Sequence, residues 1–318
     1  MPHLILIADI GGTSSRLALV GPDGIPTSIQ IHRNNDFAGF EELIEADLTA
    51  RGLATRAHVG GAVLAIAGPA DGEVVKLTNR DWAFSKRAMR RHFGWQKLVA
   101  VNDFEALAYG VPALGAADLI PVGHGHAAPK APILICGPGT GFGVAGLLRV
   151  GRTLHAMTGE GGRARLGAAT AEEARMLAHM VGELGPVVVE HALSGSGLAR
   201  MHHIFSGERM TPEAIIGAAL VQDEAALATI AIFLKIFGRI AGDLALIIDA
   251  RGGVYLAGGV SMALAPFFAA SEFRAAFEEH PPHEPRLIAT PVHIITHSTP
   301  GLIGCGQIGG LLAKTLRA

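Results

Sequence analysis

The same short pattern occurs twice in this chain: an apolar run, a turn rich in Gly and Thr, and a second apolar run. The first copy covers residues 4–20, with its turn at 9–15. The second covers residues 131–150, with its turn at 137–143. Each copy predicts two strands joined by a tight turn. Two copies in separate halves predict a duplicated α/β fold of two domains with a cleft between them.

The remaining periodic segments alternate between strands and helices, which is typical of an α/β protein. Strands are predicted at residues 61–67, 98–101 and 254–257, and helices at 40–51, 104–114, 211–220, 224–248 and 301–316. We expect a small α/β domain at residues 1–105 and a large α/β domain at 106–300. The C-terminal helix, at about 301–318, is expected to pack back on the small domain.

Composition narrows the class of protein. With 318 residues, 49% of them hydrophobic, the chain is long enough for two buried cores. A formal net charge of −2 gives no electrostatic sign of nucleic-acid binding. The apolar run at residues 4–8 is too short for a signal peptide, and no uninterrupted apolar run has membrane-spanning length. Two distant cysteines, Cys136 and Cys305, fit a reducing compartment. We therefore expect a cytoplasmic protein that binds neither nucleic acid nor membrane.

The first turn has the composition of an anion-binding loop. Gly11 and Gly12 leave backbone N–H groups accessible, Thr13 adds a hydroxyl donor, and Asp9 is suited to hold Mg²⁺ directly or through water. A single turn of this kind is also compatible with an ordinary hairpin. Two further glycine-containing turns follow predicted strands, at residues 137–143 and 258–259. Three such turns favour a nucleotide-binding cleft.

Two further side chains have an open interpretation. Asp103 follows a buried strand at a predicted helix start, where a carboxylate serves equally as a catalytic base or as a helix cap. Trp82 is suited either to stacking on a sugar ring or to core packing.

Taken in chain order, these segments resemble the motifs of the actin/hexokinase/Hsp70 superfamily, and more closely those of the bacterial glucokinase family. The matching stretches are residues 9–19, 77–84, 101–104, 137–143, 159–162, 193–198, 252–259 and 271–278. They cover nearly the whole chain. The resemblance implies an actin-like ATPase (ribonuclease H-like) fold, a homodimer, and transfer of phosphate from ATP to the 6-hydroxyl of a hexose with Mg²⁺.

The resemblance also implies roles for individual residues. The ATP phosphates would lie on the backbone of Ala8, Asp9, Ile10, Gly11, Gly12 and Thr13 and, from the other domain, on Gly137, Gly139, Thr140 and Gly141. Gly258 and Gly259 would lie near the adenosine. Asn102, Asp103, Glu160 and Glu190 would bind the sugar, with Asp103 as the catalytic base.

One loop departs from the family pattern. The family usually continues Gly-Glu-Gly-Gly with His, an aliphatic residue and Asp, whereas this chain has Arg163, Ala164 and Arg165. Neutral His donates and accepts hydrogen bonds, but Arg only donates. Three interpretations are open: Arg163 pairs with Glu160, it contacts an anionic or differently substituted sugar, or it points to solvent. The leading hypothesis is therefore a kinase for glucose or a related hexose. The alternative is a sugar- or nucleotide-binding protein with altered specificity or lost kinase activity.

Overall fold

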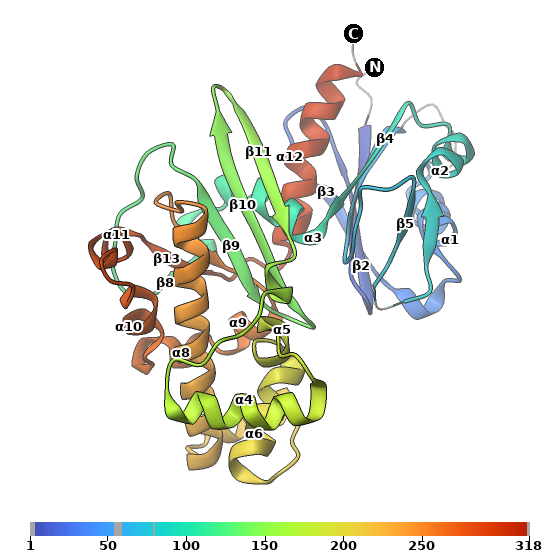
Figure 1. Cartoon of the computed structure of the whole chain (residues 1–318). Helices are drawn as coiled ribbons and strands as arrows, with labels where there is room; N and C mark the ends of the chain where they lie inside the picture. Colours follow the sequence, from blue (N-terminus) through green and yellow to red (C-terminus); the bar gives the residue numbers. More distant parts are fainter. Residues whose placement is uncertain (1–3, 54–58, 79, 317–318) are drawn as a thin grey trace. The chain divides into compact units, whose positions relative to one another are not determined.

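The structure is a computed structural model that describes residues 4–53, 59–78 and 80–316, so position 79 of the predicted 77–84 motif lies outside the described residues. The chain forms two compact units. The first comprises Met1–Leu114 and His297–Ala318, and the second Gly115–Thr296. Figure 1 shows the course of the chain through both units.

A five-stranded mixed sheet forms the centre of the first unit, in the order β3-β2-β1-β4-β7. Its strands are β1 (Leu4–Ile10), β2 (Ser14–Val20), β3 (Thr27–Arg33), β4 (Val59–Ile66) and β7 (Lys97–Asn102). The first three strands form an antiparallel meander, and β4 and β7 run parallel to β1. Alternate residues of β1 enter two different cores, which explains its nearly continuous apolar sequence.

Helices cover both faces of this sheet. On one face lie α1 (Phe40–Ala50) and α2 (Lys86–Phe93), with the small hairpin β5 (Val74–Lys76) and β6 (Ala83–Ser85). Trp82 belongs to this core: it is 6% exposed and contacts Phe40 edge-on at a centroid distance of 5.3 Å. Core packing is therefore its role within this unit.

On the other face, α3 (Asp103–Gly110) packs against α12 (Pro300–Thr315), the last helix of the chain. Figure 1 shows α12 alongside α3. A side chain at Gly304 would put a Cβ atom 1.7 Å from the carbonyl oxygen of Ala106, so only glycine permits this approach. The division differs from the boundary expected at residue 105, because the packing against α12 keeps the whole of α3 in the first unit.

The second unit contains a six-stranded sheet in the order β11-β10-β9-β12-β13-β8. Its strands are β8 (Leu119–Pro121), β9 (Ile133–Pro138), β10 (Phe142–Val150), β11 (Thr153–Gly159), β12 (Val254–Leu256) and β13 (Val292–Ile295). The order β11-β10-β9-β12-β13 repeats β3-β2-β1-β4-β7, with the same antiparallel and parallel pairings. The duplication predicted from the two Gly/Thr turns is thus confirmed in the topology.

The α-helices described in the second unit all follow β11 in the chain. They are α4 (Ala171–Leu184), α5 (Val189–Ala192), α6 (Gly195–Ser206), α7 (Pro212–Leu220), α8 (Glu224–Ile247), α9 (Gly259–Ala263), α10 (Phe273–Glu278) and α11 (Glu284–Ala289). The core is built on α8, where Phe237 packs edge-on against Phe273. Among the described residues, no helix combines the length and apolar character needed to cross a bilayer.

Candidate active site

The turn between β1 and β2 presents backbone donors to solvent. The N–H of Gly11 donates to the carbonyl of Ser14, which closes the turn at 3.2 Å. The N–H groups of Gly12 and Thr13 have no acceptor within the described residues, and both residues are exposed. Two adjacent N–H groups without an acceptor in a tight turn are suited to bind an anion such as phosphate. The neighbouring side chains of Ala8 and Ile10 are fully buried, so these two residues offer a ligand only their backbone.

Asn34 fixes the shape of this first turn, and the sequence did not identify it. Its side-chain amide donates to the carbonyl of Gly11 at 2.8 Å, and its side-chain oxygen accepts from the Ser15 hydroxyl at 2.7 Å. Its backbone N–H donates to the carbonyl of Thr13 at 3.0 Å. Asn34 and Ser15 are both completely buried. The turn is therefore held from three sides by one neutral side chain and its backbone.

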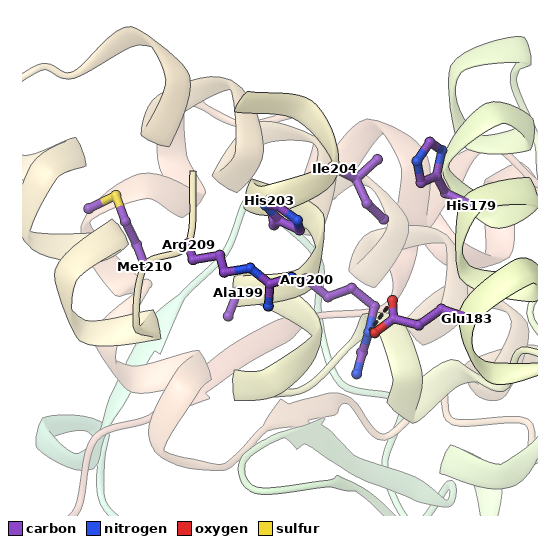
Figure 2. A pocket seen from close by; sticks show the side chains of 8 residues that line it. All are labelled: His179, Glu183, Ala199, Arg200, His203, Ile204, Arg209 and Met210. Atoms are coloured by element: carbon purple, nitrogen blue, oxygen red, sulfur yellow. Dashed lines mark ion pairs between the residues drawn. The ribbon is translucent and has the colours of Figure 1, made fainter. Parts of the chain in front are cut away.

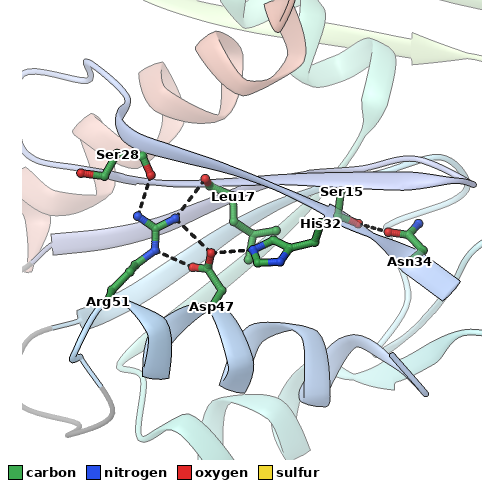
Figure 3. Close-up of polar contacts among 7 residues, drawn as sticks. All are labelled: Ser15, Leu17, Ser28, His32, Asn34, Asp47 and Arg51. Carbon is green, nitrogen blue, oxygen red and sulfur yellow. Dashed lines mark hydrogen bonds and ion pairs between the residues drawn. The ribbon is translucent and has the colours of Figure 1, made fainter. Parts of the chain in front are cut away.

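A charged cluster anchors the strand that carries Asn34. Asp47 on α1 is fully buried and accepts two hydrogen bonds from Arg51 and one contact from His32 on β3, at 2.9 Å. Arg51 also donates to the carbonyls of Ser28 and Leu17. Figure 3 shows this cluster on one side of β2 and β3 and the Ser15–Asn34 bond at their far end. This charged cluster attaches α1 to β2 and β3, and it thereby fixes the strand after which Asn34 follows.

Asp9 and Asp103 lie at the carboxyl ends of parallel strands. Asp9 is next to last in β1, and Asp103 directly follows β7; both strands pair with β4. Strands are about 4.8 Å apart, so the ends of β1 and β7 are separated by roughly 10 Å. Asp9 points to the face of the sheet that α3 and α12 cover, because its alternate neighbours Ile5 and Ile7 belong to that core.

Helix starts surround the two carboxylates. A Cβ atom at Gly301, in the first turn of α12, would lie 2.9 Å from a carboxylate oxygen of Asp9, so glycine lets this helix start approach Asp9 closely. Asn102 is the N-cap of α3; its side chain accepts from the N–H of Phe104 and donates to the carbonyl of Gly68. Asn102 is the N-cap, so Asp103 is the first residue of α3, and its Oδ1 also accepts from the N–H of Phe104 at 3.0 Å.

Both carboxyl groups are harder to ionise than usual. Burial raises the pKa of Asp9, partly offset by the charge of Arg16. Burial, and then the negative charge of Asp9, raise the pKa of Asp103 to about 6. A carboxyl group with this pKa is mostly ionised at neutral pH yet more basic than an ordinary aspartate, which suits a proton acceptor.

The second unit repeats the turn but not its anchor. Between β9 and β10 the N–H of Gly139 donates to the carbonyl of Gly141, while the N–H groups of Thr140 and Gly141 have no acceptor in the described part of the chain. Glu190 on α5 accepts from the N–H of Phe142 at 3.1 Å. A Cβ atom at Gly141 would lie within 2.3 Å of the same carboxylate, so only glycine admits Glu190 here.

The two remaining glycines of the nucleotide motif lie beside this second turn. Gly258 has φ +94° and precedes α9, and a Cβ atom there would lie 2.3 Å from the carbonyl oxygen of Pro138. The predicted residues Gly137, Gly139, Thr140, Gly141, Gly258 and Gly259 are therefore brought together at the carboxyl ends of β9 and β12.

The departure from the family pattern has a definite contact. The guanidinium group of Arg163 lies 3.3 Å from Oε1 of Glu190, the carboxylate oxygen that does not accept from Phe142. Arg163 therefore pairs with Glu190 rather than with Glu160, and it does not simply point to solvent. Glu160 is exposed and precedes the short 3₁₀ turn Gly161–Arg163. Because both oxygens of Glu190 are engaged, one carboxylate links the Arg163 loop to the second glycine turn.

The described residues contain no cluster of three or more His, Cys, Asp or Glu side chains able to enclose a metal ion. The charge of Arg16 only partly offsets the effect of burial on Asp9, and Asp103 feels the negative charge of Asp9, so a divalent cation would stabilise both carboxylates. The residues present thus fit a cation that is held by a few carboxylate contacts and the phosphates of a substrate, as Mg²⁺ usually is. Both cysteines are free and buried.

A family model and a similar sequence both point to the same family of proteins. A sequence model of the glucokinase family matches residues 6–310. A glucokinase from Chelativorans sp. (strain BNC1) is 39% identical over 308 residues, which is 94% of this chain and 89% of the relative.

Two solved structures share the fold. A glucokinase from an Antarctic psychrotroph is 29% identical with a TM-score of 0.85, over 96% of this chain and 98% of the other. The glucokinase of Balamuthia mandrillaris, solved with glucose, has a TM-score of 0.78 at 23% identity, over 97% of this chain and 94% of the other. The mixed α/β fold of each unit, with its repeated strand order, agrees with these matches.

Proposed function

Because this chain belongs to the glucokinase family, we propose that it transfers the γ-phosphoryl group of ATP to the 6-hydroxyl group of glucose. It is a sugar kinase by family membership. The observation that carries the mechanism is the juxtaposition of Asp103, with its raised pKa, and a turn with two free N–H groups at the same edge of one sheet.

Asp103 acts as the catalytic base in this proposal. A sugar hydroxyl is far too weak an acid to ionise beforehand, so Asp103 accepts its proton as the bond to phosphorus forms. Asn102 holds the start of α3 and thereby the position of Asp103. Glu160 and Glu190 are acceptor-only groups suited to sugar hydroxyls.

The two glycine turns act on the phosphates. The free N–H groups of Gly12 and Thr13 and those of Thr140 and Gly141 donate to phosphate oxygens, whose charge spreads during transfer. Gly258 and Gly259 accommodate the adenosine. Asp9 holds Mg²⁺, directly or through water, and the ion supplies charge neutralisation for the phosphates. We further propose that sugar and nucleotide bind in a cleft between the two units. The protein is expected to be cytoplasmic and homodimeric.

One observation favours a second function, the binding of sugar or nucleotide without turnover. Glu190 is paired with Arg163, so a sugar must compete for that carboxylate oxygen. If the pair persists, glucose loses one acceptor, and the protein would act as a sensor or prefer a sugar with an anionic substituent that Arg163 can bind.

The deciding experiment is a coupled ADP-release assay with Mg·ATP and a panel of hexoses, amino sugars and sugar acids. We expect turnover with glucose and a loss of about 10²- to 10⁴-fold in Asp103→Asn, the usual contribution of a positioned base. Turnover confined to a sugar acid would identify Arg163 as the specificity residue. If no sugar supports Asp103-dependent ADP release, the kinase proposal is wrong and the binding function takes its place.

A further inference from the structure

A pocket of about 580 Å³ lies in the second unit, among α4, α6 and the segment that precedes α7. Its volume is in the range of small-molecule sites. None of its lining residues belongs to the two glycine turns, to the loop at residues 159–165 or to α5. Figure 2 shows side chains from these elements projecting into the same space.

The helices place basic groups on the facing sides of this pocket. Arg200 and His203 are three residues apart on α6, so they share one face of the helix. Arg209 enters from the segment after α6, and His179 lies on α4. The only acidic lining residue is Glu183, also on α4. Two permanent positive charges therefore face one negative charge, and each histidine adds a further positive charge when protonated.

The two arginines have capacity left for a ligand. Arg209 makes no hydrogen bond or ion pair with any residue in the ranges 4–53, 59–78 and 80–316. Arg200 is only 20% exposed, and its Nε faces Glu183 at 3.8 Å, which is beyond hydrogen-bond distance. Guanidinium groups bind phosphate and carboxylate through paired N–H donors. Ile204 and Met210 contribute an apolar wall, which strengthens charge interactions beside it.

Arg200 also connects the pocket to the proposed sugar site within the same unit. Its Nη1 donates to the carbonyl of His191 at 2.6 Å. His191 is the residue after Glu190, and both belong to the four-residue helix α5. A ligand that draws Arg200 toward the pocket changes the hydrogen bonding of α5, and with it the position of the Glu190 carboxylate.

We propose that this α4–α6 pocket binds a small molecule with a phosphate group and a second anionic group, and that its occupation modulates sugar binding through Arg200 and α5. The binding step stands on the pocket alone. The modulation step rests on the proposed kinase function.

Binding is tested without turnover, by isothermal titration of the whole protein with three probes of decreasing charge. These are 3-phosphoglycerate, glycerol 3-phosphate and glycerol. We expect affinity to fall in that order, with no binding of glycerol. Hydrogen–deuterium exchange should show protection by 3-phosphoglycerate in α4 and α6. Protection confined to the glycine turns would overturn the proposal, as would equal affinity for all three probes or no binding.

Variants locate the site. Arg209→Ala should weaken 3-phosphoglycerate at least about tenfold, because a hydrogen bond between charged groups is lost. Arg152→Ala is the matched control: it removes the same exposed charge from the β10–β11 turn of the same unit and should leave affinity unchanged. Glu183→Gln should tighten binding several-fold, an effect that general destabilisation does not produce. Equal affinity in Arg209→Ala and wild type contradicts the proposal.

The modulation is tested by the KM for glucose with and without saturating 3-phosphoglycerate. We expect a change of about fivefold or more, the range of ordinary allosteric coupling, that is absent in Arg209→Ala. Absence of activity with every sugar would refute the proposed function while the titration still decides the pocket. An unchanged KM despite confirmed binding refutes the modulation.

Discussion

The two glycine turns occupy equivalent positions in a duplicated sheet, yet they are anchored by different chemistry. Each turn closes with one hydrogen bond and leaves two N–H groups free. The β1–β2 turn is held by Asn34, a neutral and completely buried amide. The β9–β10 turn is held by Glu190, a charged group that also contacts Arg163.

This difference gives the two turns, both proposed to bind phosphate, different links to the rest of their units. Within the part of the first unit that the structure describes, the hydrogen bonds of Asn34 go to the turn, to Ser15 and to Phe37, so the shape of the first turn is fixed by its own sheet. The anchor of the second turn is itself a proposed sugar ligand, so the loop at residues 159–163 and the second turn respond to one another. The two turns share the same backbone arrangement, but only the anchor of the second turn, Glu190, connects its turn to the Arg163 loop.

Among variants of the two glycine turns and their anchors, the largest effect is expected from Gly141→Ala in the second turn. The added Cβ displaces the Glu190 carboxylate, which breaks its bond to Phe142 and its contact with Arg163. A hydrogen bond to a charged group contributes about 1.5–3 kcal/mol, so kcat/KM for glucose should fall about tenfold to hundredfold. Steady-state kinetics with both substrates measures it.

Gly139→Ala in the same turn is the structural comparison, because its Cβ would meet no atom within 4 Å. Its melting temperature should match the wild type, whereas that of Gly141→Ala should be lower. Equal melting temperatures would mean that Glu190 does not anchor the turn.

Asn34→Ala tests the anchor of the first turn. The variant leaves the Gly11 carbonyl and the buried Ser15 hydroxyl without partners. Each buried polar group left unsatisfied lowers the free energy of unfolding by about 1–3 kcal/mol. We expect the KM for ATP to rise about tenfold with the KM for glucose nearly unchanged. Asn35→Ala, at the exposed neighbour, serves as the control. A parallel rise in the KM for glucose would mean that the first turn is also coupled to the sugar.

The pH dependence of activity should report Asp103. The group must be ionised to accept a proton, and its pKa is about 6, so kcat/KM should fall tenfold per pH unit below about pH 6. The charge of Asp9 contributes to that elevation after burial, so Asp9→Asn should lower the pKa of Asp103. Carbon-13 NMR titration of the Asp103 carboxyl in nucleotide-free protein measures this shift, and an unchanged midpoint would show that Asp9 has no influence.

The smallest effect is expected from Arg163→His. The Arg163–Glu190 contact is 3.3 Å long and the Arg163 side chain is 59% exposed, so the pair contributes less than about 1 kcal/mol. Freeing Glu190 should lower the KM for glucose about threefold and leave the KM for ATP unchanged. A higher KM would instead mean that Arg163 contacts the sugar directly.

The sequence predicted the strands with long apolar runs and the helices with apolar residues at helical spacing. The strands beside the two turns and the helices 40–51, 224–248 and 301–316 correspond to β1, β2, β9, β10, α1, α8 and α12. The strands β3, β8 and β11, which lie at sheet edges, were missed. Polar residues such as Gln30 in β3 and His155 in β11 interrupt the apolar pattern, and β8 has only three residues.

The candidate site was predictable only where motif residues are contiguous. Asn34 lies 23 positions from Gly11, and Glu190 lies 48 from Phe142, so no local pattern links either anchor to its turn. The pairing of Arg163 with Glu190 rather than Glu160 likewise depends on α5 lying beside the 160–164 segment, a tertiary contact.

The packing of α12 against β1 also determines the order in which the protein is completed during synthesis. The thiol of Cys305 contacts the carbonyl of Ala8 across 297 positions of sequence. At the usual rates of translation, about 5–20 residues per second, the ribosome needs roughly 15–60 s to reach the covering helix. Throughout that interval Ile5 and Ile7 lack the part of their cover that α12 supplies, and only α3 is available on that face. The second unit is continuous in sequence, so its chain is complete before that of the first unit, whose sheet keeps apolar surface exposed until α12 is made.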